Sequence, residues 1–226
     1  INEKGQRLVA FGRYAGLVGA YNGIRAYGLK HELFELPKAE TLPDLKAMKA
    51  TLSKYQLPAI KIVLTGTGRV GSGAKEILEA MHIKEVSIED YLEKDFETPV
   101  FCQLEALDYN RNKKGEEHSI HNFYFHPEEY ESSFMRFAAV SDMFVAGHFY
   151  GQGSPYLFTR EDACSPEFKI TVVADISCDI DGPVASTIRP STIGDPIYGY
   201  DAATETEVDF MSPGAIAVMA VDNLPC

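Results

Sequence analysis

The sequence predicts an α/β protein built on a doubly wound, mostly parallel β-sheet with a helical crossover at its N-terminal side. Two observations predict this class. Short apolar runs rich in β-branched residues recur along the chain with helical patterns between them, which is typical of βα units. A glycine-rich turn joins the first of these runs to a helical pattern.

The N-terminal segment is predicted to be helical. Residues 7–28 carry apolar side chains at a period near 3.6, which indicates one helix or a helix pair, the alternative being a glycine-broken loop. Glycines recur three to four residues apart within it, at Gly12, Gly16, Gly19 and Gly23. Because glycine weakens an isolated helix, this spacing predicts close backbone contact along one helix face.

A linker and a second helix follow. Residues 36–43 hold two prolines and are expected to be a linker. Residues 42–55 are predicted to form an exposed helix with Pro43 in its first turn. We interpret residues 1–58 as a crossover and linker that arrive from another domain.

The pattern changes at residue 59. Strands are predicted over residues 59–65, 100–104, 143–150, 170–176 and 216–221, and helices over residues 74–81 and 127–139. The strand runs give way to polar residues at their C-terminal ends, as at Asp175 and Asp222. Ligands of open parallel sheets bind outside the carboxyl ends of the strands, so we expect the site there.

The glycine-rich turn spans residues 66–73 and matches the pattern G-x-G-x-x-G between a predicted strand and a predicted helix. Gly66 permits the tight turn, Gly68 lets the backbone approach a pyrophosphate, and Gly71 lets the helix pack close to the strand. Arg69 and Val70 begin the helix, whose free N–H groups attract phosphate. The sequence therefore predicts a Rossmann-type dinucleotide site within residues 59–226, the alternative being a purely structural turn.

The fingerprint also requires an acidic residue that holds the adenosine ribose. Glu105 directly follows the predicted strand 100–104, and we prefer it for this role. The alternatives are Glu85, Glu89, Asp90 and Asp108. An acidic group favours NAD, although the cations Arg111, Lys113 and Lys114 leave NADP open.

Charge and composition exclude several partners. The chain carries 33 acidic and 21 basic residues, a net charge of −12, which disfavours a nucleic-acid partner. No run reaches the roughly 18 consecutive apolar residues of a membrane span, so we expect no membrane insertion. The four cysteines are widely spaced, which excludes a CxxC or zinc site and favours a cytoplasmic location.

The ends of the sequence suggest that it is a piece of a longer protein. It begins with Ile1 and stops at Cys226 directly after an apolar run. Exposed polar tails are more usual at the ends of a domain.

Together, the segments resemble the lysine-forming saccharopine dehydrogenases and lysine-ketoglutarate reductases, which are relatives of alanine dehydrogenase. The resemblance rests on residues 10–20, 66–73, 175–179, 191–201 and 221–225, which follow the family's order. It implies two α/β domains, of which the second binds the cofactor. The implied reaction is the nicotinamide-dependent conversion of saccharopine to lysine and 2-oxoglutarate.

The resemblance also implies a set of site residues. Gly66, Gly68, Arg69 and Gly71 would hold the pyrophosphate, and Glu105 the ribose. The nicotinamide side of the cleft would be lined by Asp175, Ser177, Asp179, Gly147 to Tyr150, Asp222, Asn223 and Leu224, with Asp175 and Asp179 as the catalytic candidates. A small-molecule substrate is implied, and a homo-oligomer is compatible with the sequence.

This sequence departs from the family in one respect that bears on activity. The family's lysine and histidine for acid–base chemistry belong to an N-terminal segment that is absent here, so we do not expect turnover by this chain alone. Alternatives are an alanine or opine-type dehydrogenase, and a non-catalytic nucleotide-binding module.

Other histidines and aromatic residues of the sequence are candidates for a metal site or for a structural role. His118, His121, His126 and Glu128 could form a metal site, but a solvated loop is the preferred interpretation, and no metal is expected. The aromatic residues Phe123, Tyr124 and Phe125 are expected to anchor the insertion at residues 110–131. His148 lies near a strand end, and a structural role is preferred for it.

Overall fold

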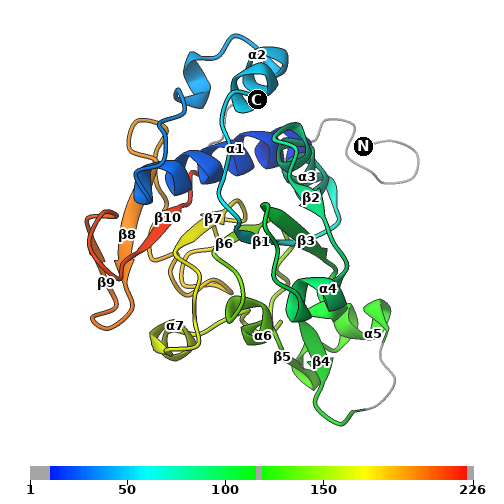
Figure 1. Cartoon of the computed structure of the whole chain (residues 1–226). Coiled ribbons are helices and arrows are strands. Elements are labelled where there is room, and N and C mark those ends of the chain that lie inside the picture. The colour runs from blue at the N-terminus through cyan, green and yellow to red at the C-terminus, as the bar shows by residue number, and fades with distance from the viewer. Residues whose placement is uncertain (1–10, 116–118, 223–226) are drawn as a thin grey trace.

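The computed structural model describes residues 11–115 and 119–222. An eight-stranded sheet in the order β2-β3-β1-β6-β7-β10-β8-β9 forms its centre (Figure 1). The strands are β1 (Lys61–Thr65), β2 (Lys84–Glu85), β3 (Val100–Leu104), β6 (Met143–Ala146), β7 (Val172–Asp175), β8 (Ile197–Asp201), β9 (Thr206–Val208) and β10 (Ile216–Met219). Six strands from β2 to β10 are parallel, and β8 and β9 close the sheet in antiparallel fashion.

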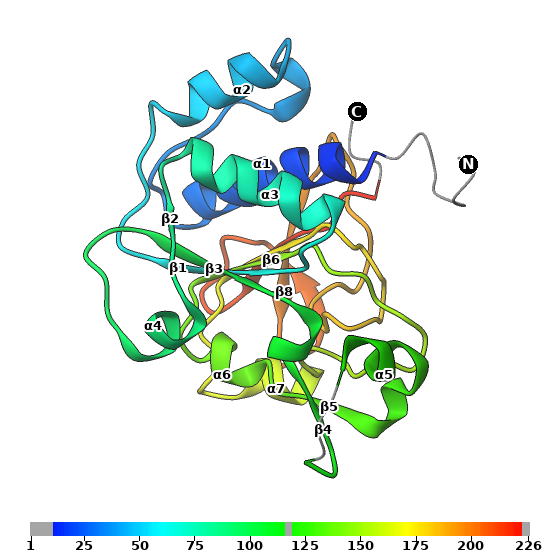
Figure 2. The same ribbon diagram turned by 90° about the vertical axis from the view of Figure 1, so that its right-hand side faces the viewer.

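Helices cover both faces of the sheet. On one face lie α1 (Gly12–Lys30), α2 (Leu45–Leu52) and α3 (Arg69–Ala80), and on the other α4 (Ile88–Glu93), α6 (Met135–Ala138) and α7 (Arg160–Cys164). Figure 2 shows α1 and α3 side by side above the sheet with α6 and α7 below it. Ile62 and Leu64 of β1 belong to the first core and Val63 to the second, as the strand period of two requires. The predicted doubly wound α/β fold is confirmed.

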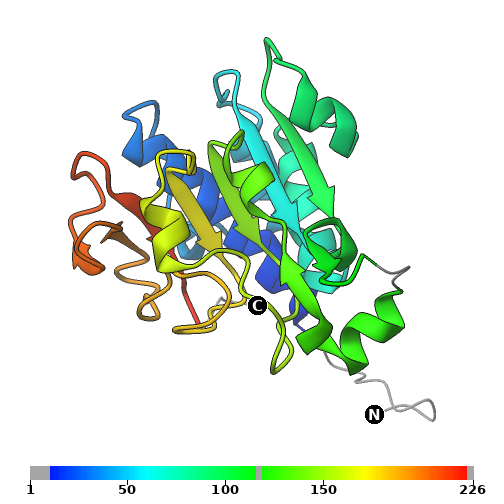
Figure 3. The same cartoon turned by 90° about the horizontal axis from the view of Figure 1, so that it is seen from below.

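The order of the strands creates a switch point beside β1. The chain leaves β1 toward β2 and β3 on one side, then returns to place β6 on its other side, in parallel. Figure 3, seen from the side of α6 and α7, shows these strands lying next to one another. Ligands of such sheets bind in the crevice where the strand order reverses.

Helix α1 packs on α3 through its glycines, as the spacing predicted. A Cβ added at Gly16 would collide with the backbone carbonyl of Val70, and one at Gly73 with that of Arg13. Leu17, Tyr21 and Ile24 of α1 share one hydrophobic core with the sheet. The division at residues 58 and 59 stays a prediction, and α1 is part of the packing of the sheet.

Residues 127–139 do not form the predicted helix. The structure places there η3 (Pro127–Glu129), β5 (Tyr130–Ser132) and the short α6. β5 pairs with β4 (Asn110–Asn112) in a small antiparallel hairpin that also carries α5 (Ile120–Phe125). The apolar spacing that indicated a helix is shared by a strand and a helical turn, both of which bury aromatic side chains.

Two predicted elements are shorter in the structure. Helix α2 begins at Leu45 because Asp44 accepts a hydrogen bond from the N–H of Ala47 and caps it, so that Pro43 precedes the helix. Its Met48 and Leu52 are buried, so one face is covered and not exposed. β6 ends at Ala146, where Gly147 begins the turn. No helix of the described residues is long and apolar enough to cross a bilayer.

Candidate nucleotide-binding site

The glycine turn after β1 is tightly packed at both of its ends. Gly66 has a φ of +91°, a conformation that favours glycine, and its N–H donates to the carbonyl of Leu104 (2.9 Å) at the end of β3. A Cβ added at Gly71 would overlap the carbonyl oxygen of Gly66. Gln103 Nε2 also donates to that carbonyl (2.9 Å). These contacts match the packing roles that the sequence predicts for Gly66 and Gly71.

Gly68 is different because it faces open space. A Cβ added there would meet no atom within 4 Å. Gly68 is the N-cap of α3, with no side chain capping the helix and no acidic residue in the first turn. Arg69 is exposed and forms no ion pair within the described ranges. A bare helix N-terminus beside a free guanidinium suits an anion such as pyrophosphate.

The end of β6 closes the turn from its other side. Gly147 donates its N–H to the carbonyl of Thr65 (3.1 Å), and a Cβ on it would lie 3.2 Å from the nitrogen of Gly71. His148 follows, and its Nδ1 lies 2.8 Å from Thr65 Oγ1. Gly147, expected only from the resemblance, is therefore in direct contact with the glycine turn.

His148 is buried and holds one polar atom without a partner. Among the described residues its Nε2 has no hydrogen-bond partner, and the side chain is packed edge-on to Tyr109 with ring centroids 6.2 Å apart. Burial lowers the pKa of His148 to about 4, so the ring is neutral at pH 7. A buried polar atom without a partner calls for an explanation, and a ligand beside it is one.

A hollow of about 410 Å³ lies over the turn. It is lined by Gly66, Thr67, Gly68, Arg69, Val70, Ala106, Tyr109, Tyr124, Gly147, His148 and Phe149. Five residues predicted to bind the cofactor therefore line one hollow at the switch point of the sheet, namely Gly66, Gly68, Arg69, Val70 and Gly147. His148 and Phe149 belong to the range 147–150 that the resemblance places on the nicotinamide side of the cleft, and here they line the hollow over the turn. Tyr109 and Tyr124 were not predicted here, since their local sequence gives no sign of which way their side chains face.

Glu105 occupies the position that the fingerprint requires. It directly follows β3, the neighbour of β1, and is exposed. Its carboxylate accepts the N–H of Asp108, and the Asp108 carboxylate accepts the N–H of Glu105 (2.6 Å). One carboxylate oxygen of Glu105 thus remains for a ribose diol.

Two of the alternatives to Glu105 form ion pairs elsewhere. Glu85 lies on the edge strand β2 and pairs with Lys75 (2.6 Å), and Asp90 pairs with Lys94 (2.7 Å). The cation Arg111, which kept NADP open, pairs with Glu131 (2.7 Å).

Asp175 is enclosed at the end of β7. Its side chain accepts hydrogen bonds from Ser177 Oγ (2.6 Å), from the N–H groups of Ser177 and Cys178 (3.1 Å each) and from Thr187 Oγ1 (2.6 Å). Burial raises the pKa of Asp175, and these hydrogen bonds oppose the rise. The carboxyl is completely buried, and its hydrogen bonds hold the backbone of the 175–179 turn in place.

The remaining predicted residues lie farther along the same edge. Ser177 and Asp179 follow β7, two strands from β1, and do not line the hollow described above. Asp179 is half-buried, and burial raises its pKa. Asp222 is exposed after β10, whereas Asn223 and Leu224 lie outside the described residues.

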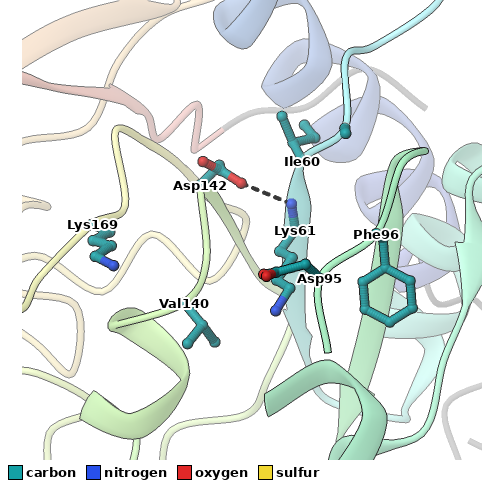
Figure 4. Close-up of a pocket in the computed structure, with 8 residues that line it drawn as sticks. Ile60, Lys61, Asp95, Phe96, Val140, Asp142 and Lys169 are labelled. Atoms are coloured by element: carbon teal, nitrogen blue, oxygen red, sulfur yellow. Dashed lines mark hydrogen bonds between the residues drawn. The ribbon is translucent and has the colours of Figure 1, made fainter. Parts of the chain in front are cut away.

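A second hollow opens at the opposite, amino edge of the sheet (Figure 4). It measures about 280 Å³, and its walls include Lys61, Asp95, Asp142 and Lys169. Lys61 donates its N–H to Asp142 Oδ2 (2.8 Å) and its Nζ to the carbonyl of Tyr91 (2.9 Å). Lys61 and Asp142 are thus partnered within the fold, and the hollow lies at the opposite end of the strands from the glycine turn.

The part of the chain that the structure describes contains no group of three or more His, Cys, Asp or Glu side chains placed to hold a metal ion. His118, a member of the histidine cluster considered from the sequence, lies outside that part. Phe123 anchors the insertion as predicted, being only 5% exposed, but Tyr124 and Phe125 are 57% and 68% exposed.

No family model matches the chain. Curated relatives do match it along its length. A mouse protein named mitochondrial alpha-aminoadipic semialdehyde synthase is 27% identical over 269 residues, covering 100% of this chain and 29% of the relative. A Schizosaccharomyces pombe protein named NAD(+)-dependent, L-lysine-forming saccharopine dehydrogenase is 23% identical over 235 residues, covering 99% of this chain and 54% of the relative.

The chain is therefore distantly similar, over its whole length, to the saccharopine dehydrogenases and the semialdehyde synthases, and it spans between about a quarter and a half of their lengths. Among solved structures, an L-alanine dehydrogenase aligns with 95% of this chain and 48% of its own length, at a TM-score of 0.45 and 14% identity. The predicted resemblance is confirmed at this distant level. The name of the mouse relative places that protein in mitochondria, so the cytoplasmic location of this chain stays a prediction.

Proposed function

We propose that this chain is the nicotinamide-dinucleotide-binding part of a saccharopine dehydrogenase-like oxidoreductase that acts on a carbon–nitrogen bond of an amino acid. The observation that carries the proposal is the glycine turn at the switch point, where the open Gly68 and the unpaired Arg69 face the hollow. The full-length similarity to saccharopine dehydrogenases supports the choice of reaction.

The glycine turn and Glu105 would bind different parts of the cofactor. The N–H groups at the start of α3 and the Arg69 guanidinium would hold the pyrophosphate, while Gly68 leaves room for it. Glu105 would accept hydrogen bonds from the adenosine ribose hydroxyls. Its negative charge would repel a 2′-phosphate, which favours NAD over NADP.

The other end of the carboxyl edge would hold the nicotinamide and the substrate. A bound nicotinamide cofactor would accept or supply the hydride, and the protein orients the reacting groups. Asp175 acts as a positioning residue, because its hydrogen bonds hold Ser177 and the 177–178 backbone in place. Asp179, partly exposed nearby, is the remaining catalytic candidate of this chain.

Titration with NADH and with NADPH tests the cofactor assignment. We expect the wild type to bind NADH more tightly than NADPH. We expect Glu105→Gln to weaken NADH binding by about tenfold, since the ribose loses a charged acceptor, and so to reduce the difference in affinity between NADH and NADPH. Asp90→Asn, which removes a surface carboxylate paired with Lys94, is the matched control. A wild-type protein that binds neither cofactor at millimolar concentration contradicts the assignment.

An assay of the full-length protein tests the reaction. Lysine, 2-oxoglutarate and NADH should together give cofactor oxidation that depends on both organic substrates. Turnover with pyruvate and ammonia in their place would move the assignment to an alanine dehydrogenase. Binding of the cofactor without turnover in either assay would indicate a nucleotide-binding module.

A further inference from the structure

Tyr124 of the insertion lines the hollow over the glycine turn. Tyr124, on α5, lines this hollow together with Tyr109 and Phe149, which follow β3 and β6. Figures 1 and 2 place α5 beside the β4–β5 hairpin at one corner of the molecule. Residues far apart in sequence therefore present three aromatic rings to one space.

Neighbours of Tyr124 on α5 pack against the rest of the protein, although the Tyr124 ring itself is exposed. Its neighbour Phe123 is buried and packs edge-on against Tyr130, with ring centroids 5.1 Å apart. Ser119 caps α5 by accepting the N–H of Asn122 (3.2 Å), and Asn122 Nδ2 lies 3.2 Å from Tyr130 Oη. A large aromatic side chain at the mouth of a hollow that aromatic residues line is typical of a ligand pocket.

The position of the hollow relative to the turn indicates which half of a dinucleotide would occupy it. Beyond the turn itself, Ala106 and Tyr109 after β3 and Tyr124 of the insertion line the hollow on the side of Glu105, and residues 147–149 after β6 line it opposite them. Ser177 and Asp179, which follow β7 one strand farther away, do not line it. A dinucleotide that crosses the turn at its pyrophosphate places the adenosine on the side of the acidic residue after the neighbouring strand. The hollow therefore belongs to the adenosine half.

We propose that Tyr124 stacks on the adenine ring of the dinucleotide, so that the insertion serves as the adenine-binding wall of the site. Aromatic side chains bind planar bases by stacking, which contributes through the ring face and does not require the phenol hydroxyl. Tyr109 and His148, both buried, line the same hollow. The proposal rests on the proposed function and adds to it the residue that recognises the base.

The experiment compares two probes in the full-length protein by saturation-transfer NMR and calorimetry. ADP-ribose contains the adenine, and nicotinamide mononucleotide lacks it. In Tyr124→Ala we expect affinity for ADP-ribose and NADH to fall by about tenfold, with loss of saturation at adenine H2 and H8. Affinity for nicotinamide mononucleotide should stay unchanged, and Tyr124→Phe should bind all probes within about twofold of the wild type.

Phe125→Ala is the matched control, because Phe125 is an equally exposed aromatic residue of the same helix that does not line the hollow. Its affinities should equal those of the wild type. Unchanged ADP-ribose affinity in Tyr124→Ala would overturn the stacking role while leaving the proposed function intact. An equal loss for nicotinamide mononucleotide would also overturn it. If the wild-type protein binds neither NADH nor ADP-ribose, the proposed function falls and this inference falls with it.

Discussion

At the scale of single residues, the glycines of one turn have separate physical duties. Gly71 is required by packing, because any Cβ there would overlap the carbonyl of Gly66. Gly68 is not required by packing, since nothing lies within 4 Å of the position of its Cβ. A residue that the fold does not need and that opens onto the hollow is the one whose size should matter to a ligand.

Gly68→Ala and Gly71→Ala should therefore behave differently. Gly68→Ala should cost no more than about 1 kcal/mol of unfolding free energy, yet weaken NADH binding by about tenfold or more, because its methyl group occupies the approach of the pyrophosphate. Gly71→Ala should cost about 3 kcal/mol, because backbone must move. Denaturant unfolding and NADH titration of both variants measure this. Full NADH affinity in Gly68→Ala would argue against a phosphate at this position.

His148 makes stability depend on pH. Its pKa is lowered from 6.5 to about 4 in the folded protein, so between these pH values the unfolded chain binds a proton that the folded chain does not. The free energy of unfolding should then fall as pH is lowered from about 6.5 to 4, by up to about 3 kcal/mol.

In His148→Leu the decrease in unfolding free energy that His148 causes between pH 6.5 and 4 should disappear. Loss of the hydrogen bond to Thr65 would lower the stability at pH 7 separately. Unfolding measured at half-unit pH steps gives the slope, and His121→Gln, at an exposed histidine, should keep it. Parallel slopes for wild type and His148→Leu would show that His148 is accessible to protons in the folded state.

At the scale of elements, the contact between α1 and α3 positions the turn. The two helices touch backbone to backbone at Gly16 and Gly73, which fixes the start of α3 and hence the N–H groups that face the hollow. Helices approach this closely only where small residues face each other. The glycines of α1 thus serve the site although they lie outside it.

Gly16→Ala should separate these helices. The added methyl group would collide with the carbonyl of Val70, so we expect a loss of about 3 kcal/mol in unfolding free energy despite the better helix propensity of alanine. Gly12→Ala is the control, because its Cβ would lie 3.2 Å from Arg69 Cβ, a contact that is far less close than the one at Gly16. Thermal unfolding of both proteins would reveal the difference, and equal melting temperatures would show that α1 adjusts freely.

At the scale of the whole molecule, the sheet is held between two cores, and α1 covers the face of β6, β7 and β10. Tyr21 and Ile24 of α1 are completely buried in the first core, and Tyr21 Oη donates to the carbonyl of Pro37 (2.8 Å). Residues before position 59 are consequently part of the packing that keeps the strand ends, and the site, in place.

A chain that begins at residue 59 should therefore fail to fold cooperatively. Removing α1 and α2 exposes to water the apolar side chains that α1 covers on one sheet face, including Val145, Ala174 and Met219. Circular dichroism during thermal unfolding should show no cooperative transition, in contrast to the 226-residue chain. A sharp transition would show that residues 59–226 are an independent folding unit.

Local patterns in the sequence were enough to predict the strands, the glycine turn and the position of Glu105. β-Branched runs, helical period and the conformational needs of Gly66 are properties of neighbouring residues, so they can be read along the chain. The same reasoning failed at residues 127–139, where an apolar period of helical type is divided between a strand and a helical turn. It missed β8, which is buried but contains no run of β-branched residues, and β9, which is three residues long and mostly exposed.

Only the tertiary structure decided which side chains share a space. It brought Tyr124 of the insertion to the glycine turn, paired His148 with Thr65, and enclosed Asp175, which the sequence suggested as a catalytic residue. The physical reason is that burial and contact depend on how distant segments pack, whereas turn geometry and strand propensity depend on adjacent residues. The sequence alone determined that a glycine-rich turn follows the first strand, and the packing of the chain determined what surrounds it.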